Sequence, residues 1–381
     1  MRRVRACPKE TSIAAPVYPV ILCGGSGERL WPASTPARPK PFLPLVDSRS
    51  SFQAAALRAR PLAREGGEVL VVAGERHATL VREQLAAVRV DGLTLLEPEG
   101  RDTAPAIAAA AGWVAQRHPD AVLVVLPADH HIPDGEAFRA AISATLSAAR
   151  DGGIVTLGLR PAKASSAMGY IRPGAGGDAV RPIRAFVEKP DAARAASLVG
   201  EGALWNSGIF VAMARTFVEE TARLAAEVAA AVSEGLHGVM VEDDAVRLKP
   251  AFAAAPKIAF DRAVMEHTGR GFVLPVAFGW SDLGAWDAVL AASPRDERGV
   301  SAGRGASAWD CSDVLVRAEP GLPVVVAGAE RLAVVAEPGA VLVCGLEAAQ
   351  QVRNVPDLAV GRGGSVRAAA GVQVALIGAA A

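Results

Sequence analysis

Short, continuously apolar runs alternate with alanine-rich segments of helical spacing through the first part of the chain. The apolar runs are bounded by Gly, Pro or Asp, as buried strands are; they are Val17–Cys23, Glu68–Ala73, Ala121–Leu126 and Ile154–Leu159. The helical segments are Phe52–Ala63, Arg76–Val88, Pro105–Arg117 and Glu136–Arg150. Strands that are apolar throughout are typical of a parallel sheet with helices on both faces. The alternation therefore predicts an α/β fold with a doubly wound, mostly parallel sheet.

The pattern loosens after Gly169 and changes in kind after Trp286. The later strand and helix candidates are Tyr170–Arg172, Ile183–Glu188 and Gly208–Ala212, with helices near Asp191–Val199 and Thr216–Ser233. Beyond Trp286, Val-rich pieces such as "VVVAG" and "AVLVCG" are punctuated by Gly and Pro, which is typical of short strands. We expect a frayed leader at 1–15, a main α/β domain at 16–295 and a small β-rich C-terminal domain at 300–381.

Composition excludes several classes of partner. Lys plus Arg and Asp plus Glu each number 40 in 381 residues, so no net field attracts nucleic acid or an anionic membrane. No apolar run approaches the roughly 20 residues of a membrane span. The cysteines, Cys7, Cys23, Cys311 and Cys344, lack the spacing of a zinc site and indicate a reducing compartment. The basic N-terminus precedes too short an apolar run for a signal peptide. We expect a cytoplasmic protein with no nucleic-acid or membrane partner.

A glycine-rich turn follows the first apolar run and precedes two cations. The segment contains Gly24, Gly25, Ser26 and Gly27, followed by Arg29 and Lys40. It lacks the Gly-Lys pair of a P-loop, and Leu30 stands where a dinucleotide fingerprint has its third glycine. Glycine lets a backbone approach a ligand and direct N–H groups at an anion, and the two cations can neutralise phosphate. A plain turn with solvated cations is the alternative.

Further polar residues follow predicted strands. In an open α/β sheet, ligands bind at the carboxyl ends of the strands. Asp129 ends the most apolar strand, although a cap or turn role is an equal alternative, and His130 and His131 follow it. We disfavour metal binding by this pair, because adjacent side chains point apart. The other polar positions are Arg101 and Asp102, which follow Gly100, then Glu188, Lys189 and Asn206. Asp282 lies between Trp280 and Trp286, which we expect to pack.

Ten blocks in order resemble the sugar-nucleotide pyrophosphorylases, and among them the mannose-1-phosphate guanylyltransferases. They span about Val20 to Val289 and read "LCGGSGERLWP", "RPKPFLPL", "EGRDTAPAIA", "LPADHHI", "TLGLRP", "MGYI", "FVEKPD", "LWNSGIF", "DRAVMEHT" and "WSDLGAWDA". The chain departs from the pattern at four positions: Glu28 replaces Thr, Pro41 replaces Gln, Asp102 replaces Asn and Met168 replaces an aromatic residue.

The resemblance implies a nucleotide-diphospho-sugar transferase fold, which is Rossmann-like, with residues 16–295 as its catalytic domain. It implies that GTP and a hexose 1-phosphate, mannose 1-phosphate in the first place, react to give GDP-hexose and pyrophosphate with Mg²⁺ or Mn²⁺. The implied catalytic residues are Arg29, Lys40, Asp129 and Asp282, of which the two aspartates hold the metal. The implied nucleotide-binding residues are Gly24, Gly25, Ser26, Gly27, Arg29, Lys40 and Arg101. The implied sugar-phosphate-binding residues are Gly169, Glu188, Lys189 and Asn206.

Two other functions remain open at this point. One is a same-fold enzyme with another base or sugar, such as a heptose 1-phosphate. The other is a non-catalytic regulatory homologue that binds sugar nucleotide; the retained residues Lys40, Asp129, Lys189 and Asp282 argue against it. Reading guanine requires an acceptor near the turn or in the Glu97–Arg101 loop, and these candidates are not separated. A homo-oligomer is also left open.

Overall fold

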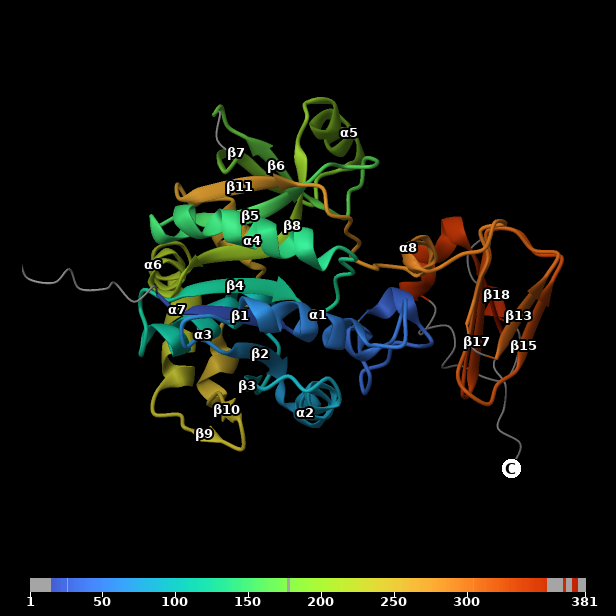
Figure 1. Cartoon of the computed structure of the whole chain (residues 1–381), viewed down its shortest axis with the longest axis horizontal. Helices are drawn as coiled ribbons and strands as arrows, with labels where there is room; N and C mark the ends of the chain where they lie inside the picture. Colours follow the sequence, from blue (N-terminus) through green and yellow to red (C-terminus); the bar gives the residue numbers. More distant parts are fainter. Residues whose placement is uncertain are drawn as a thin grey trace, which may run out of the picture.

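The computed structural model describes residues 15–25, 27–176, 179–303, 305–354, 366–367 and 372–375. Within them, eleven strands form one sheet in the order β5-β11-β7-β6-β8-β4-β1-β2-β3-β10-β9 (Figure 1). The strands are β1 (Val17–Leu22), β2 (Val69–Gly74), β3 (Gly92–Glu97), β4 (Val122–Pro127), β5 (Ile154–Leu159), β6 (Gly169–Pro173), β7 (Arg181–Glu188), β8 (Leu204–Met213), β9 (Val241–Glu242), β10 (Ala245–Arg247) and β11 (Gly271–Val276). The expected leader at 1–15 lies outside the described residues except for its last position.

The sheet is mixed, and its parallel part comes mainly from the first half of the chain. Strands β4, β1, β2, β3 and β10 run parallel to one another, each strand of the first four being separated from the next by a helix. Strands β6, β7 and β8 pair antiparallel with their neighbours. A short connection suffices for antiparallel pairing, whereas a parallel pair needs a crossover of roughly a dozen residues or more. The α/β class is confirmed, and the sheet is less parallel than expected.

Helices cover both faces of this sheet. Their bounds are α1 (Ser51–Ala59), α2 (Ala78–Ala87), α3 (Thr103–Ala115), α4 (Gly135–Arg150), α5 (Ala192–Gly200), α6 (Ala214–Leu224), α7 (Ala226–Leu236) and α8 (Trp286–Ala292). One apolar core contains side chains of α3, α6 and α7, and a second contains side chains of α1, α2 and α4. Helix α3 is buried almost all round beneath α6 and α7, and small alanine side chains allow that close packing. None of the described helices is both long and apolar enough to cross a bilayer.

A second sheet follows α8, in the order β12-β14-β16-β17-β19-β18, beside the parallel pair β13-β15. Its elements are β12 (Ser301–Ala302), β13 (Ala306–Trp309), β14 (Leu315–Ala318), β15 (Val324–Ala327), β16 (Leu332–Glu337), β17 (Ala340–Gly345), the 3₁₀ helix η7 (Leu346–Asn354), β18 (Val366–Arg367) and β19 (Val372–Ala375). We call the described residues from 301 onward the C-terminal unit. In Figure 1 the blue segment between β1 and α1 lies between this unit and the large sheet. The domain boundary near 295–300 stays a prediction.

Candidate active site

Four parallel strands end at one edge of the large sheet. Strands β1, β2, β3 and β4 finish at Leu22, Gly74, Glu97 and Pro127, and their registers place these ends side by side. The backbone N–H of Ala128, just after β4, donates to the Leu22 carbonyl at 3.0 Å. This carboxyl edge is where ligands bind in open α/β sheets. The glycine turn and Asp129 therefore start from neighbouring strands at the edge where we expect the site.

The glycine turn leaves its first part open to a ligand. Gly24 and Gly25 are exposed, and a Cβ added to either would meet no described atom within 4 Å. Gly27 has φ 67°, and a Cβ there would lie 2.4 Å from the Cβ of Lys40. Only glycine lets the turn pass that close to Lys40. Ser26 lies outside the described residues.

Lys40 joins the two aspartates that the sequence separates. It begins the 3₁₀ helix η2 (Lys40–Phe42), and its side chain is only 8% exposed. Its ammonium donates to Asp129 Oδ2 at 2.5 Å and to the backbone carbonyl of Asp282. Burial raises the pKa of Asp129, but the Lys40 charge and hydrogen bond, with a further contribution from His130, outweigh it and lower the pKa overall. Asp129 is therefore a carboxylate at neutral pH.

The loops that carry Asp129 and Asp282 are tied together by their neighbours. His131 and Ser281 exchange two backbone hydrogen bonds, of 2.9 and 3.0 Å. The Trp280 indole N–H donates to His130 Nδ1 at 3.2 Å. Burial lowers the pKa of His130 to about 4 against the attraction of Asp129, so the ring is neutral with its proton on Nε2. The histidine pair and Trp280 thus hold the loops, in keeping with the packing role expected for the tryptophan.

The carboxylates at this point fit a hard divalent cation. Asp129 is ionised, and Asp282 uses Oδ1 to accept the N–H of Gly284 at 3.3 Å. Across the described ranges, no group of three or more His, Cys, Asp or Glu side chains is arranged for a metal. Two carboxylates suit an ion such as Mg²⁺, which keeps several waters and prefers oxygen ligands, and do not suit zinc.

The four expected sugar-phosphate residues come together at a second place. Gly169 of β6 stands opposite Glu188 of β7, and a Cβ at Gly169 would lie 2.4 Å from Glu188 Oε2 and 3.4 Å from the Cβ of Asn206. Lys189 lies 3.0 Å from Glu188 Oε1. The hydroxyl of Thr156 donates to Asn206 Oδ1 at 2.9 Å, which fixes the amide. The absence of a side chain at Gly169 is what leaves room beside the Glu188 carboxylate.

Sequence reasoning missed Asp261 and Glu266 at this place. Asp261 begins the π-helical turn η6 (Asp261–Met265) and accepts from Asn206 Nδ2 at 2.6 Å. Burial, followed by the charge of Glu188, raises the pKa of Asp261 to about 7. Glu266 Oε1 accepts the backbone N–H of Glu188 at 3.1 Å. Both acids lie in the block "DRAVMEHT", which signalled the family without assigning a role to either residue.

Glu97 stands out at the end of β3. Its side-chain atom Oε1 is buried and has no hydrogen-bond partner among the described residues. Burial, helped by Asp102, raises the pKa of Glu97 to about 7. The Glu97 charge also contributes, after burial and Asp129, to the raised pKa of Cys23, which places Glu97 near the glycine turn. A buried acceptor without a donor is uncommon in folded proteins, and this one lies at the edge where we expect the site.

The comparisons with known proteins agree with this geometry. Residues 18–299 match the nucleotidyl transferase family. The chain belongs to the nucleotidyl transferase family. The xanthan biosynthesis protein XanB of Xanthomonas campestris pv. campestris (strain B100) is 40% identical over 342 residues, which are 89% of this chain and 72% of XanB. The mannose-1-phosphate guanylyltransferase ManC of Salmonella typhimurium is 36% identical over 349 residues, with the same two shares. A crystal structure described as mannose-1-phosphate geranyltransferase from Thermus thermophilus has a TM-score of 0.78 and 34% identity and covers 91% of this chain and 99% of its own.

Two expected nucleotide-binding cations of this nucleotidyltransferase contact partners other than Asp129 and Asp282. Arg29 Nη1 donates to Gln350 Oε1 of η7 at 2.6 Å. Arg101 Nη2 lies 2.9 Å from Glu99 Oε2, while Arg101 Nε is buried without a partner among the described residues. Asp102 has φ 68° and caps α3 by accepting the N–H of Thr103. Their binding roles stay predictions.

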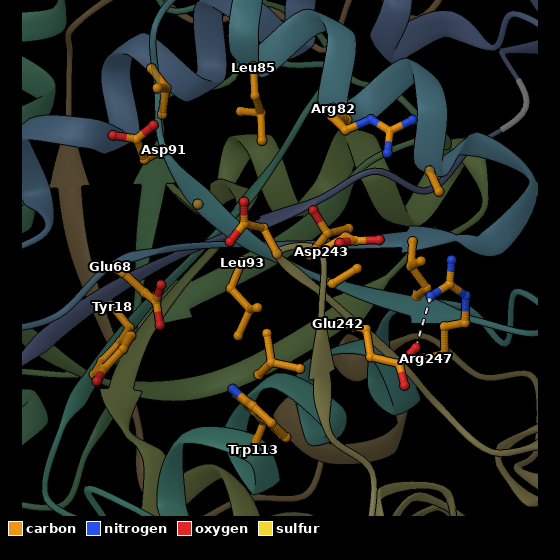
Figure 2. Close-up of a pocket in the computed structure, with 18 of the residues that line it drawn as sticks. Tyr18, Glu68, Arg82, Leu85, Asp91, Leu93, Trp113, Glu242, Asp243 and Arg247 are labelled. Carbon is orange, nitrogen blue, oxygen red and sulfur yellow. Dashed lines mark ion pairs between the residues drawn. The ribbon is translucent and has the colours of Figure 1, made fainter.

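A cavity of about 580 Å³ lies at the other edge of the nucleotidyltransferase sheet (Figure 2). Its lining includes Tyr18 near the start of β1, Glu68 just before β2, and Leu93 near the start of β3. Figure 2 shows Asp243, Glu242 and Arg247 along its other side. Parallel strands begin at this edge, so the cavity is remote from the glycine turn and Lys40.

Proposed function

We propose that the protein makes GDP-mannose and pyrophosphate from GTP and mannose 1-phosphate. One observation carries the proposal: Lys40 bridges the carboxylate of Asp129 and the backbone of Asp282, beside an open glycine turn at the carboxyl edge. That arrangement suits a reaction between two polyanions. Relatives named mannose-1-phosphate guanylyltransferase support the choice of substrates.

The proposed reaction needs no general base. A phosphate oxygen of mannose 1-phosphate, already anionic, attacks the α-phosphorus of GTP in line with the bond to the β-phosphate. That P–O bond breaks, and its electron pair leaves with pyrophosphate. The difficulty is to hold the two anions together and to stabilise extra charge at the α-phosphorus. The N–H groups of the glycine turn, Lys40 and Arg29 are the groups of this chain that would do so.

Asp129 and Asp282 are the residues that would hold the divalent cation, for which we propose Mg²⁺ or Mn²⁺. When bound, such an ion neutralises charge on the transferring phosphates. Lys40 keeps Asp129 ionised in the protein itself, so the oxygen ligand is available across the neutral pH range. The backbone bridge from His131 to Ser281 holds the two loops that carry these aspartates next to each other.

The sugar phosphate is proposed to bind beside Gly169. Carboxylates accept hydrogen bonds from sugar hydroxyls, and Glu188 and Asp261 both stand there next to the fixed amide of Asn206. Lys189 is 56% exposed, so its ammonium can meet a phosphate that enters from solvent. The region then combines acceptors for hydroxyls with one cation for the anionic end.

Glu97 is our proposal for the group that reads the base. Guanine presents N1–H and N2–H₂ as adjacent donors, and the two oxygens of an ionised carboxylate can accept from both. The pKa of Glu97 is about 7 in the free protein, and hydrogen bonds from these two donors favour its ionised form. A donor from the ligand satisfies the buried oxygen that the described protein residues leave without a partner. Uracil and thymine each offer one N–H at this edge, and adenine offers its N6 amino group beside N1, which is an acceptor. A carboxylate that accepts twice therefore favours guanine.

The cytoplasm is the proposed compartment. Cys23, Cys311 and Cys344 are free and buried in the part of the chain that the structure describes, which suits a reducing environment. No partner other than the two substrates is proposed, and the oligomeric state is left open.

The proposal is tested by a panel of GTP, ATP, UTP and dTTP against mannose, glucose and heptose 1-phosphates, read by pyrophosphate release. We expect GTP with mannose 1-phosphate to give the highest kcat/KM. In a Glu97→Gln variant, the preference for GTP over ATP should fall by roughly tenfold or more, because an amide offers one acceptor and one donor and matches adenine. A wild-type preference for another nucleotide would move the protein to a different base, and no turnover with any pair would favour a binding-only homologue.

A further inference from the structure

The segment that carries Arg29 and Lys40 shares a hydrophobic core with the C-terminal unit. One cluster of buried side chains joins three parts of the chain. From the segment after the glycine turn it takes Leu30, Ala33, Leu43 and Leu45; from the region of Asp282 it takes Leu283, Ala285, Trp286, Val289 and Leu290; and from the C-terminal unit it takes Leu315, Ala333, Val335, Leu342, Cys344, Ala348, Ala349 and Val352. The C-terminal unit therefore packs against the segment that carries Lys40. It also packs against the region just after Asp282, the residue whose carbonyl accepts from Lys40.

Three polar contacts cross the same boundary. Arg317 Nη1 donates to the carbonyl of Pro44 at 2.6 Å, and Arg38 pairs with Glu319 at 3.3 Å. The third contact joins Arg29 Nη1 to Gln350 Oε1 at 2.6 Å. The first two contacts involve Pro44 and Arg38, on either side of Lys40, whereas Arg29 stands two residues after Gly27 of the glycine turn.

We propose that Gln350 is a positioning residue for Arg29, through which the C-terminal unit takes part in binding the nucleotide triphosphate. The proposal rests on the proposed function in one respect, the role of Arg29 as a phosphate-binding cation. A guanidinium has five N–H donors and is always charged, so a bond to one amide oxygen leaves the other donors for phosphate. Holding a long side chain in one orientation before binding reduces the entropy lost when the ligand orders it.

The chemistry of the amide matters for this role. Gln350 is neutral, so it orients the guanidinium without cancelling the charge that attracts phosphate. A carboxylate at the same position forms an ion pair with Arg29 and competes with the triphosphate for its donors. Gln350→Glu therefore separates positioning from simple attachment, because it keeps or strengthens the contact across the boundary while weakening nucleotide binding.

The experiment compares Gln350→Ala, Gln350→Glu and Arg29→Ala, with Gln351→Ala as the matched control, since Gln351 is the next residue and is also exposed. KM for GTP and for mannose 1-phosphate, GTP affinity by calorimetry and Tm are measured on the full chain. Gln350→Ala should raise KM for GTP by about two- to tenfold, the factor expected for losing one pre-ordered side chain, and leave KM for mannose 1-phosphate unchanged. Gln350→Glu should raise KM for GTP further without lowering Tm. Gln351→Ala should match wild type.

The double variant Arg29→Ala with Gln350→Ala decides between positioning and plain structural support. If Gln350 acts through Arg29, adding Gln350→Ala to Arg29→Ala changes KM for GTP no further. An equal effect of Gln350→Ala in both backgrounds, or equal rises in both KM values with a lower Tm, overturns the proposal. If Arg29→Ala alone leaves GTP affinity unchanged, the phosphate role of Arg29 is wrong, and this inference with it. Calorimetry with GTP alone gives this answer even if the sugar substrate or the reaction proves different.

Discussion

Two groups of carboxylates in this nucleotidyltransferase have opposite electrostatic surroundings. Asp129 lies against the Lys40 ammonium, and its pKa is lowered despite burial. Asp261 is also buried but faces Glu188, and its pKa is raised to about 7. Burial raises the pKa of both aspartates. The Lys40 charge outweighs burial at Asp129, whereas the Glu188 charge adds to burial at Asp261.

The difference supports different proposed roles for the two groups. A carboxylate that stays ionised is a ligand for a cation and belongs with phosphate chemistry. A carboxylate that holds a proton near neutral pH can donate or accept, which suits hydroxyl groups of a sugar. The amide of Asn206, fixed by Thr156 on one side and Asp261 on the other, adds a further oriented polar group on the sugar side.

The largest expected effect comes from removing the carboxylate charges of Asp129 and Asp282, and it tests the proposed role of this group directly. Asp129→Asn and Asp282→Asn should each lower kcat by at least about 10³-fold, at or above the 10²–10³ typical of one preorganised electrostatic contact. Because both are proposed to act through one ion, the double variant should be little worse than either single one. Turnover is measured by pyrophosphate release with Mg²⁺, with Mn²⁺ and with chelator, and chelator should abolish it.

Folding is the control for these variants. Asp282 contacts Lys40 through its backbone, so Asp282→Asn keeps that contact and should keep the wild-type Tm. Asp129→Asn removes the negative charge that pairs with the buried Lys40 ammonium and should lower Tm at neutral pH. The Asp129 pKa is lowered on folding, so its contribution is present above the usual carboxyl range and is lost as pH falls through the folded pKa. The Tm values of wild type and Asp129→Asn should therefore converge in acid. Full additivity of the two losses in kcat would contradict a shared ion.

Removing the cation itself is the second prediction. Lys40→Met keeps much of the apolar stem and should lower kcat by about 10²–10³-fold, because the ammonium acts mainly as charge builds at the α-phosphorus. GTP affinity, measured by calorimetry, should fall much less. The exposed residue Lys257 offers a matched control, since Lys257→Met removes the same charge elsewhere. If Lys40→Met turns over at the wild-type rate, Lys40 has no catalytic role.

Much of the α/β architecture could be predicted, and the failures have physical causes. Continuous apolar runs predicted β1, β2, β4 and β5, because strands buried on both faces carry that pattern. Strand β3 was missed although it has six residues like β1 and β2, because "GLTLLE" is rich in leucine and contains a single β-branched residue. The helix expected at Thr216–Ser233 is two helices, because the backbone leaves the helical region at Ala225, which no proline or glycine marks.

Within the site, residue types were predictable and their surroundings were not. The family blocks brought Lys40, Asp129 and Asp282 to one hypothesis, and their proximity agrees with it. What holds the loops together is a backbone bridge between His131 and Ser281, and backbone pairing between loops far apart in sequence leaves no side-chain pattern. The pKa of Asp261 depends on Glu188 from a different strand, which sequence spacing does not reveal.

The smallest expected effect is on KM for mannose 1-phosphate, and it tests the electrostatic difference between Asp261 and Asp129. Asp261→Asn imitates the protonated carboxyl, so it should resemble wild type at pH 6 and differ above pH 7. Above pH 7 wild-type Asp261 gains a negative charge beside Glu188, which disfavours an anionic sugar phosphate. The ratio of wild-type to variant KM for mannose 1-phosphate should therefore rise by a few-fold between pH 6 and pH 8, an order-of-magnitude expectation for one like charge. Taking the ratio cancels the titration of the substrate itself.

Stability gives an independent check with a definite sign. Because the folded pKa of Asp261 is raised to about 7, the folded protein holds a proton that the unfolded chain releases above the usual carboxyl range. Wild type should therefore lose stability relative to Asp261→Asn as pH rises from about 4 to about 7, and the Tm difference should level off above that. The exposed residue Asp151 supplies the control, because Asp151→Asn should track wild type throughout. A Tm difference that grows in the opposite direction would mean that Asp261 is ionised across this range. The two groups of carboxylates would then be electrostatically alike, and the division between phosphate and sugar chemistry would have to rest on Lys40 alone.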